Sequence, residues 1–125
     1  MNEEIRQKIN KIADTYGYDA QSRQCIEEMA ELTQAINKFW RKQLKCGIFT
    51  MEEVVKLNTD FNTLEEIKTE KNYQNLVEEI ADVQIMLWQM EYLLKIGIEP
   101  IIEQKLDRQI ERIKQKQTEA QNANP

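Results

Sequence analysis

Apolar side chains recur every three or four residues along most of this chain, a spacing that predicts amphipathic α-helices. The pattern predicts a first helix from about Asn2 to Tyr16 and a break at Gly17. Asp19 is a suitable N-cap for a second, long helix from about Ala20 to Lys45, which Gly47 would end. The apolar arc of this second helix consists of Ile26, Met29, Leu32, Thr33, Ile36, Phe39 and Trp40.

The most apolar helix is predicted from about Tyr73 to Ile96, with Gly97 as its C-terminal stop. Apolar residues cover most of its sides, as in a helix at the centre of a fold or in a subunit interface. Its broadest apolar face consists of Leu76, Ile80, Val83, Met86, Leu87, Met90, Leu93 and Leu94. We therefore expect a homo-oligomer, either a dimer or a tetramer, that covers this helix.

Three further segments complete the pattern. A capping box predicts a short helix from Thr50 to about Leu57. Pro100 fits the first turn of a last helix. That last helix would turn five apolar side chains inward: Ile101, Ile102, Leu106, Ile110 and Ile113. The polar tail from 117 to 125 is expected to be disordered.

Helix breakers are scarce, since the 125 residues contain only three Gly and two Pro. A chain of this length forms one domain with one modest core. We therefore predict an all-α fold, a helical bundle of four to five helices, in a single domain from 1 to 116.

Composition excludes several classes of function. The net charge is −5 without a basic block, so direct nucleic-acid binding is not expected. No segment has the apolar character of a signal peptide or a membrane span, and we expect a cytoplasmic protein without a membrane partner. The absence of His excludes a His general base and the Glu-x-x-His pairs of di-iron carboxylate proteins. Cys25 and Cys46 lack metal-ligand spacing.

Two pairs of carboxylates stand three residues apart, Glu28 with Glu31 and Glu79 with Asp82. On a helix this spacing puts both members of a pair on one face. Glu79 and Asp82 fall within an apolar stripe, where charges are unfavourable unless they are compensated. If the two helices face each other, four carboxylates meet, and a hard divalent cation such as Mg²⁺ would compensate them.

The two acidic motifs, Glu27-Glu28-x-x-Glu31 and Glu79-x-x-Asp82, resemble the signature of the MazG-like nucleoside triphosphate pyrophosphohydrolases. That superfamily is all-α and includes dimeric dUTPases, dCTP pyrophosphatases and phosphoribosyl-ATP pyrophosphohydrolase. The resemblance implies hydrolysis of an NTP or dNTP between the α- and β-phosphates, giving a monophosphate and pyrophosphate. It also implies Mg²⁺, with Mn²⁺ as a substitute, held by Glu28, Glu31, Glu79 and Asp82.

The resemblance further implies roles for groups around these ligands. Glu28 or Glu31 would be the general base that takes a proton from the attacking water. The segment Lys105-Leu106-Asp107-Arg108-Gln109 resembles the basic helix that closes the site in this family. Four side chains are candidate contacts to the nucleotide substrate: Lys38, Trp40, Lys105 and Arg108.

Two kinds of alternative stay open. A related enzyme of the same fold could act on phosphoribosyl-ATP, or on dUTP or dCTP specifically. The chain could also be a non-catalytic helical interaction module, whose carboxylates form ion pairs with Lys105, Arg108 and Arg112. Thermal melting with Mg²⁺ and a non-hydrolysable nucleotide separates the two classes, because ligands stabilise only a protein that binds them.

Overall fold

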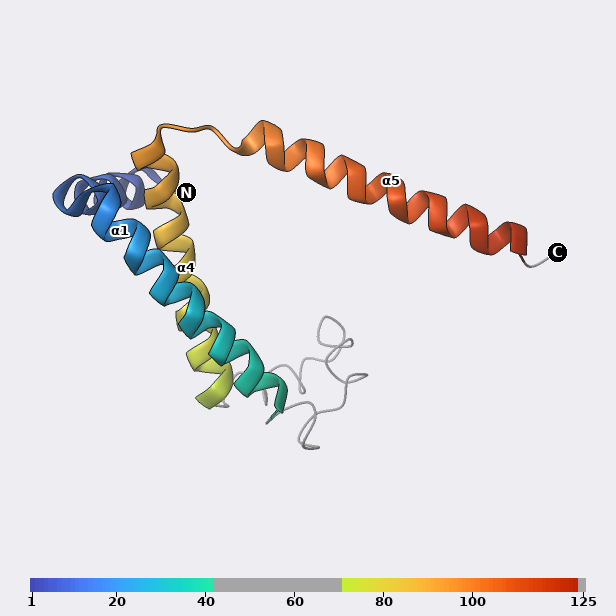
Figure 1. Cartoon of the computed structure of the whole chain (residues 1–125), viewed down its shortest axis with the longest axis horizontal. Coiled ribbons are helices and arrows are strands. Elements are labelled where there is room, and N and C mark those ends of the chain that lie inside the picture. Colours follow the sequence, from blue (N-terminus) through green and yellow to red (C-terminus); the bar gives the residue numbers. More distant parts are fainter. Residues whose placement is uncertain (42–70, 124–125) are drawn as a thin grey trace. The chain divides into compact units, whose positions relative to one another are not determined.

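The computed structural model describes residues 1–41 and 71–123. These residues form three helices and no strand: α1 (Glu3–Phe39), α4 (Lys71–Leu94) and α5 (Glu99–Ala123) (Figure 1). The all-α class is thereby confirmed for the described part of the chain. The helix predicted from Thr50 to Leu57, and the helix end predicted at Gly47, lie outside the described residues, so the expected four to five helices stay a prediction.

The helix α1 begins with a side-chain cap and bends at one glycine. The Asn2 side chain accepts a hydrogen bond of 2.8 Å from the Ile5 amide, which satisfies one of the free donors of the first turn. Gly17 has φ 80° and ψ 171°, a conformation that is essentially restricted to glycine. The break predicted at Gly17 is therefore confirmed, because this non-helical residue separates two helical segments of α1 that meet at a kink.

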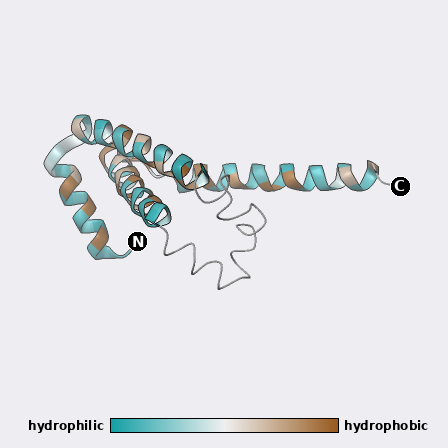
Figure 2. Cartoon of the chain, turned by 90° about the horizontal axis from the view of Figure 1, so that it is seen from below, coloured by the Kyte–Doolittle hydropathy of each residue, from teal (hydrophilic) through white to brown (hydrophobic). Residues whose placement is uncertain are grey.

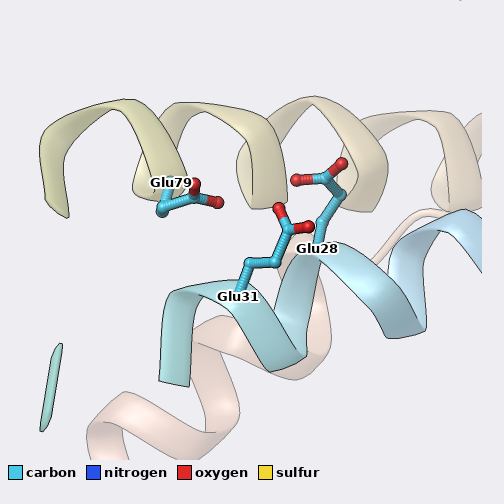
Figure 3. Close-up of side chains that lie close together, drawn as sticks. All are labelled: Glu28, Glu31 and Glu79. Carbon is cyan, nitrogen blue, oxygen red and sulfur yellow. The ribbon is translucent and has the colours of Figure 1, made fainter. Parts of the chain in front are cut away.

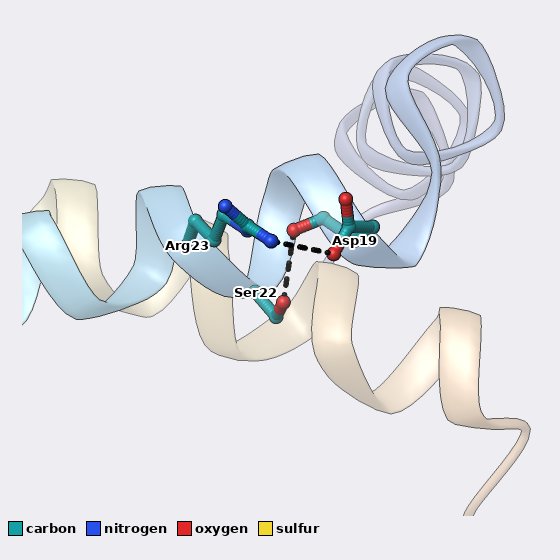
Figure 4. Close-up of polar contacts among 3 residues, drawn as sticks. All are labelled: Asp19, Ser22 and Arg23. Atoms are coloured by element: carbon teal, nitrogen blue, oxygen red, sulfur yellow. Dashed lines mark hydrogen bonds and ion pairs between the residues drawn. The ribbon is translucent and has the colours of Figure 1, made fainter.

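Directly after the kink, two polar side-chain contacts join residues of the next turn of α1 (Figure 4). The Ser22 hydroxyl donates a hydrogen bond of 3.0 Å to the Asp19 carbonyl, and the Arg23 guanidinium lies 3.4 Å from the Asp19 carboxylate. The ion-paired side chains are 77% and 88% exposed, so the pair contributes little to stability. Asp19 was expected to be an N-cap, but it lies inside α1 and its carboxylate pairs with the side chain one turn further along.

The helices α1 and α4 lie side by side and run antiparallel (Figure 1). The Tyr92 hydroxyl donates to both carboxylate oxygens of Asp14, at 2.9 and 2.8 Å. At the other end of the pair, the rings of Phe39 and Tyr73 lie 6.2 Å apart with their planes tilted by 58°. The buried residues of the two helices form a small core: Ile9, Ala13, Gln21, Cys25, Ala35, Val83, Met86 and Gln89.

The face of α1 that meets α4 differs from the predicted apolar arc. Ile26, Met29 and Ile36 are 67%, 48% and 50% exposed, whereas Cys25 and Ala35 are buried. The prediction was wrong about this rotation of the helix. A reason is size, since small side chains on α1 let the helix approach the bulkier residues of α4.

The ends of α4 and α5 also depart from the prediction. The left-handed residue that follows α4 is Lys95, with φ 54°, and not Gly97. Pro100 lies in the first turn of α5, as predicted. However, α5 continues to Ala123, into the segment expected to be a disordered tail. The residues from 114 to 121 are mostly Lys, Gln, Glu and Ala, which are strong helix formers and allow the helix to propagate.

The chain divides into two compact units, Met1–Leu94 and Lys95–Pro125, where the sequence predicted a single domain from 1 to 116. In the second unit, apolar positions recur along α5 (Figure 2). Its five apolar side chains, expected to point inward, are 44–54% exposed: Ile101, Ile102, Leu106, Ile110 and Ile113. Among the described residues, no helix combines the length and the apolar character that crossing a membrane requires.

Candidate metal centre

Three of the four predicted ligands meet between α1 and α4. Glu28 and Glu31 extend from α1, one turn apart, and Glu79 extends toward them from α4 (Figure 3). One carboxylate oxygen of each residue lies within 4.8 Å of an oxygen of the other two. The i, i+3 spacing and the antiparallel packing of the two helices together produce this cluster.

Two oxygens of the cluster are buried without a hydrogen-bond partner, Oε2 of Glu28 and Oε2 of Glu79. The other oxygen of Glu28 accepts a hydrogen bond of 2.8 Å from the side-chain amide of Gln24. A buried carboxylate oxygen without a partner is unfavourable, because it has lost water and gained nothing in exchange. An oxygen-only donor set with two such atoms fits a hard divalent cation.

The pKa values of Glu79 and Asp82, both on α4, lie above their ordinary values. Desolvation raises the pKa of Glu79, and the charges of Glu31, Asp82 and Glu28, with a hydrogen bond to Glu31, raise it further. Desolvation also raises the pKa of Asp82, and the charges of Glu28 and Glu78 add to this. Both groups therefore resist ionisation more than free carboxyls do, and a cation bound beside them would favour their ionised forms.

Asp82 stands apart from the other three carboxylates. Its oxygens fall outside the close group, and its side chain is exposed. It is nevertheless coupled by charge to Glu79 and Glu28. The structure thus brings together Glu28, Glu31 and Glu79. The Asp82 carboxylate lies outside this group and interacts with it through charge.

The basic and aromatic candidates are placed more loosely. Lys38 and Trp40 are exposed at the C-terminal end of α1, and Trp40 is 43% exposed. Lys105 and Arg108 are exposed on α5, which belongs to the second unit. Their contact with a nucleotide stays a prediction.

The ion pairs of the alternative interpretation would join the carboxylates of the first unit to Lys105, Arg108 and Arg112 of the second unit, and they stay a prediction. Among the described residues of the first unit, the ion pairs Lys8–Glu4 and Arg23–Asp19 each join residues within α1, and neither involves the carboxylate cluster.

The sequence interpretation assigned no role to Gln24 or to the buried amides Gln21 and Gln89. The signal for Gln24 was its position four residues before Glu28, from which a side-chain amide reaches a carboxylate on the next turn. For the buried pair the signal was heptad spacing, because Gln21 precedes Glu28 by seven residues. Comparisons with family models, curated proteins and solved structures find no match to this chain.

Proposed function

We propose that this chain is a Mg²⁺-dependent pyrophosphohydrolase that cleaves a nucleoside triphosphate, NTP or dNTP, between the α- and β-phosphates. The observation that carries the proposal is the carboxylate cluster, with buried, unpartnered oxygens on both helices. Its residues are those of the acidic motifs that resemble the MazG-like enzymes. Water adds to the α-phosphorus, the bond to the bridging oxygen breaks, and the products are a monophosphate and pyrophosphate.

The carboxylates are assigned two roles, metal binding and proton transfer. Glu28, Glu31 and Glu79, with Asp82 at the edge, would hold the Mg²⁺. A bound Mg²⁺ supplies charge neutralisation at the phosphates and favours ionisation of water; Mn²⁺ would substitute for it. Glu31 or Glu28 takes the proton of the attacking water.

The substrate contacts are assigned to the basic and aromatic candidates. Lys38, Lys105 and Arg108 contact the phosphates, which carry the negative charge. Trp40, which is partly exposed, offers a ring on which the base stacks. The pyrophosphate leaves with its charge balanced by these cations.

A homo-oligomer is part of the proposal. Beside the buried stripe, α1 exposes Ile26, Met29 and Ile36, and α4 exposes Ile80 and Leu87. Each of these residues lies one position after a residue of the stripe that faces the other helix, so helical geometry puts them on the same side of the antiparallel pair. An apolar surface of this kind supports association of copies through that side. Light scattering at micromolar concentration tests it, and a mass near that of one chain would contradict it.

The test of the activity is a screen of canonical NTPs and dNTPs, with pyrophosphate and phosphate detected separately. Pyrophosphate release that requires Mg²⁺ or Mn²⁺ and stops with chelator is the expected result. Phosphate release alone would place the cleavage at a different bond. If no nucleotide is hydrolysed, and neither Mg²⁺ nor a non-hydrolysable nucleotide shifts the melting temperature, the helical interaction module replaces the enzyme.

A further inference from the structure

A buried amide pair joins α1 to α4. The side-chain amide of Gln21 donates a hydrogen bond of 2.6 Å to the side-chain oxygen of Gln89. The two residues are 7% and 2% exposed, and Gln89 also points its amide nitrogen at the Met86 sulfur, 3.9 Å away. No reacting group of the proposed site lies among these atoms, so the pair needs another explanation.

The amide pair lies on the same stripe as the carboxylate cluster. Glu28 follows Gln21 by seven residues on α1, and Glu79 precedes Gln89 by ten residues on α4. In an antiparallel pair these two steps lead in the same direction. The cluster therefore lies about 10 to 15 Å from the amides along the helices.

The carboxylates do not favour the alignment that brings them together. Like charges on the two helices repel, since carboxylate oxygens of Glu28, Glu31 and Glu79 lie within 4.8 Å of one another. If α4 slid by one heptad, Glu31 and Glu79 would move apart by about 10 Å. Apolar packing alone would tolerate the slip, because apolar residues recur at heptad spacing, as in Leu76, Val83 and Met90.

We infer that the hydrogen bond between Gln21 and Gln89 sets the register of α1 against α4 and thereby positions the carboxylate cluster. In a register shifted by seven residues, Gln21 would lie opposite Asp82, or opposite position 96, which is beyond the end of α4 at Leu94. Either shift breaks the direct hydrogen bond between the two amides, and in the second shift Gln21 has no residue of α4 opposite it, which is disfavoured for a buried amide. A single buried polar pair is known to select one register among otherwise equivalent apolar alignments.

The register can be measured as a distance between two spin labels. The labels are attached at Asn37→Cys on α1 and Gln84→Cys on α4, both exposed, after Cys25→Ala and Cys46→Ala. Labelled chain is diluted with unlabelled chain, so that only distances within one chain are recorded. We expect a single distance for the parent protein, without metal or nucleotide.

The test variant is Gln21→Met with Gln89→Met, which keeps side-chain length and removes the hydrogen bond. A second distance, displaced by about 10 Å, is expected, and the slipped population should rise about fivefold or more. One unchanged distance in this variant overturns the inference. Should the Met pair fail to fold, Gln21→Leu with Gln89→Leu takes its place, since two buried leucines favour the helix pair.

The control is Tyr92→Phe, which removes the hydrogen bonds to Asp14 that also join the two helices. We expect the parent distance, unchanged. If this variant slips as much as the Met pair does, register is shared among the contacts and the inference is wrong.

The connection to the carboxylates rests on the proposed function and has its own readout. Mg²⁺, which is diamagnetic and leaves the spin labels unperturbed, should restore the single parent distance when it is added to the Met pair, because the cation binds only the aligned cluster. If Mg²⁺ changes no distance while the Met pair still slips, the register inference stands and the proposed metal site is the part that fails. The two failures are thus distinguishable in one series of samples.

Discussion

Two polar clusters interrupt the same stripe between α1 and α4, and they differ in one respect. The amides of Gln21 and Gln89 satisfy each other across the two helices. The carboxylates of Glu28 and Glu79 keep one buried oxygen each without a partner. A polar group that is satisfied internally serves the fold, whereas one that is left unsatisfied indicates a ligand that comes from outside.

Substitutions should therefore have opposite effects at the two clusters. Removing a charge from the carboxylates relieves repulsion that the fold tolerates for the sake of a ligand. Removing one amide from the glutamine pair leaves its partner buried and unpaired. Substitutions of the carboxylates should therefore lower activity more than stability, whereas a single substitution in the glutamine pair should lower stability.

The largest effect is expected at the carboxylates. Glu79→Gln and Asp82→Asn should lower pyrophosphate release by at least about 100-fold, because each removes a ligand of the metal. Without metal, the melting temperature should stay the same or rise, since repulsion falls. Turnover assays and metal-free melting curves measure both quantities.

The control for these variants is Glu27→Gln, which neutralises an exposed carboxylate next to the cluster. It should keep parental turnover and parental Mg²⁺ stabilisation. Variants of Glu79 and Asp82 that melt lower without metal, yet turn over at the parental rate, would show that these carboxylates are structural.

The opposite cluster should respond in stability. Gln21→Met alone leaves the Gln89 amide buried without its partner, and should lower the free energy of unfolding by about 1–3 kcal/mol. Adding Gln89→Met should recover most of that loss, because both polar groups are then gone. Urea unfolding of the two single variants and the double variant provides the cycle, and simple additivity would argue against a coupled pair.

A smaller effect is expected at Gln24, an amide that donates a hydrogen bond to a carboxylate of the cluster. Its amide holds one oxygen of Glu28, so Gln24→Met should weaken Mn²⁺ binding by about tenfold while Glu28 keeps its charge. Stability should change by no more than about 0.5 kcal/mol, as for an exposed i, i+4 pair. Gln34→Met, at an exposed position on the same helix, is the matched control for titrations monitored by water-proton relaxation. Equal affinities for the two variants would remove Gln24 from the site.

The smallest effect should appear in the pH dependence of the metal-free protein. The folded-state pKa values of Glu79 and Asp82 lie above their ordinary values, so the folded chain binds these protons more tightly than the unfolded chain does. The contribution of these groups to stability therefore falls as pH rises through that range. We expect the melting temperature to gain from this contribution as pH is lowered toward the ordinary pKa values of the two groups, 4.5 for Glu and 3.8 for Asp.

Saturating Mg²⁺ should flatten or reverse that slope, because the cation favours the ionised carboxylates. Glu79→Gln without metal should also flatten it. A parental slope that is identical with and without Mg²⁺ would mean that these carboxyls do not interact with the cation.

The sequence predicted the described helices and the shared face of Glu28 and Glu31, because periodicity and i, i+3 spacing are local properties. That Glu79 would join them was expected only if the two helices face each other, as α1 and α4 do. It also predicted the interruption at Gly17, since few residues other than glycine adopt that conformation. It did not predict which edge of the α1 arc faces α4. A broad apolar arc has the same periodicity whether Ile26 or Cys25 is buried, and only packing against the partner helix decides.

The remaining differences have similar causes. Lys95 ends α4 in a left-handed conformation that glycine adopts most readily. Because Gly97 lies only two residues further along, the sequence pattern favoured Gly97 as the helix stop. The amide pair was missed because a glutamine on a helix is ordinarily exposed. Only the partner helix makes its burial possible, and that information is not local to either sequence segment.

The antiparallel pair also has a consequence for the order of folding events. Phe39 and Tyr73 are 34 residues apart in the chain, whereas Gln21 and Gln89 are separated by 68. Shorter loops close first, so pairing is expected to begin near Phe39 and to proceed along the helices toward the amides. The like-charged carboxylates lie between these points, so they must approach each other before Gln21 can reach Gln89. A divalent cation present during refolding should therefore increase the rate at which α1 and α4 pair. The hydrogen bond between the glutamines would form last, and it would stabilise only the correctly aligned pair.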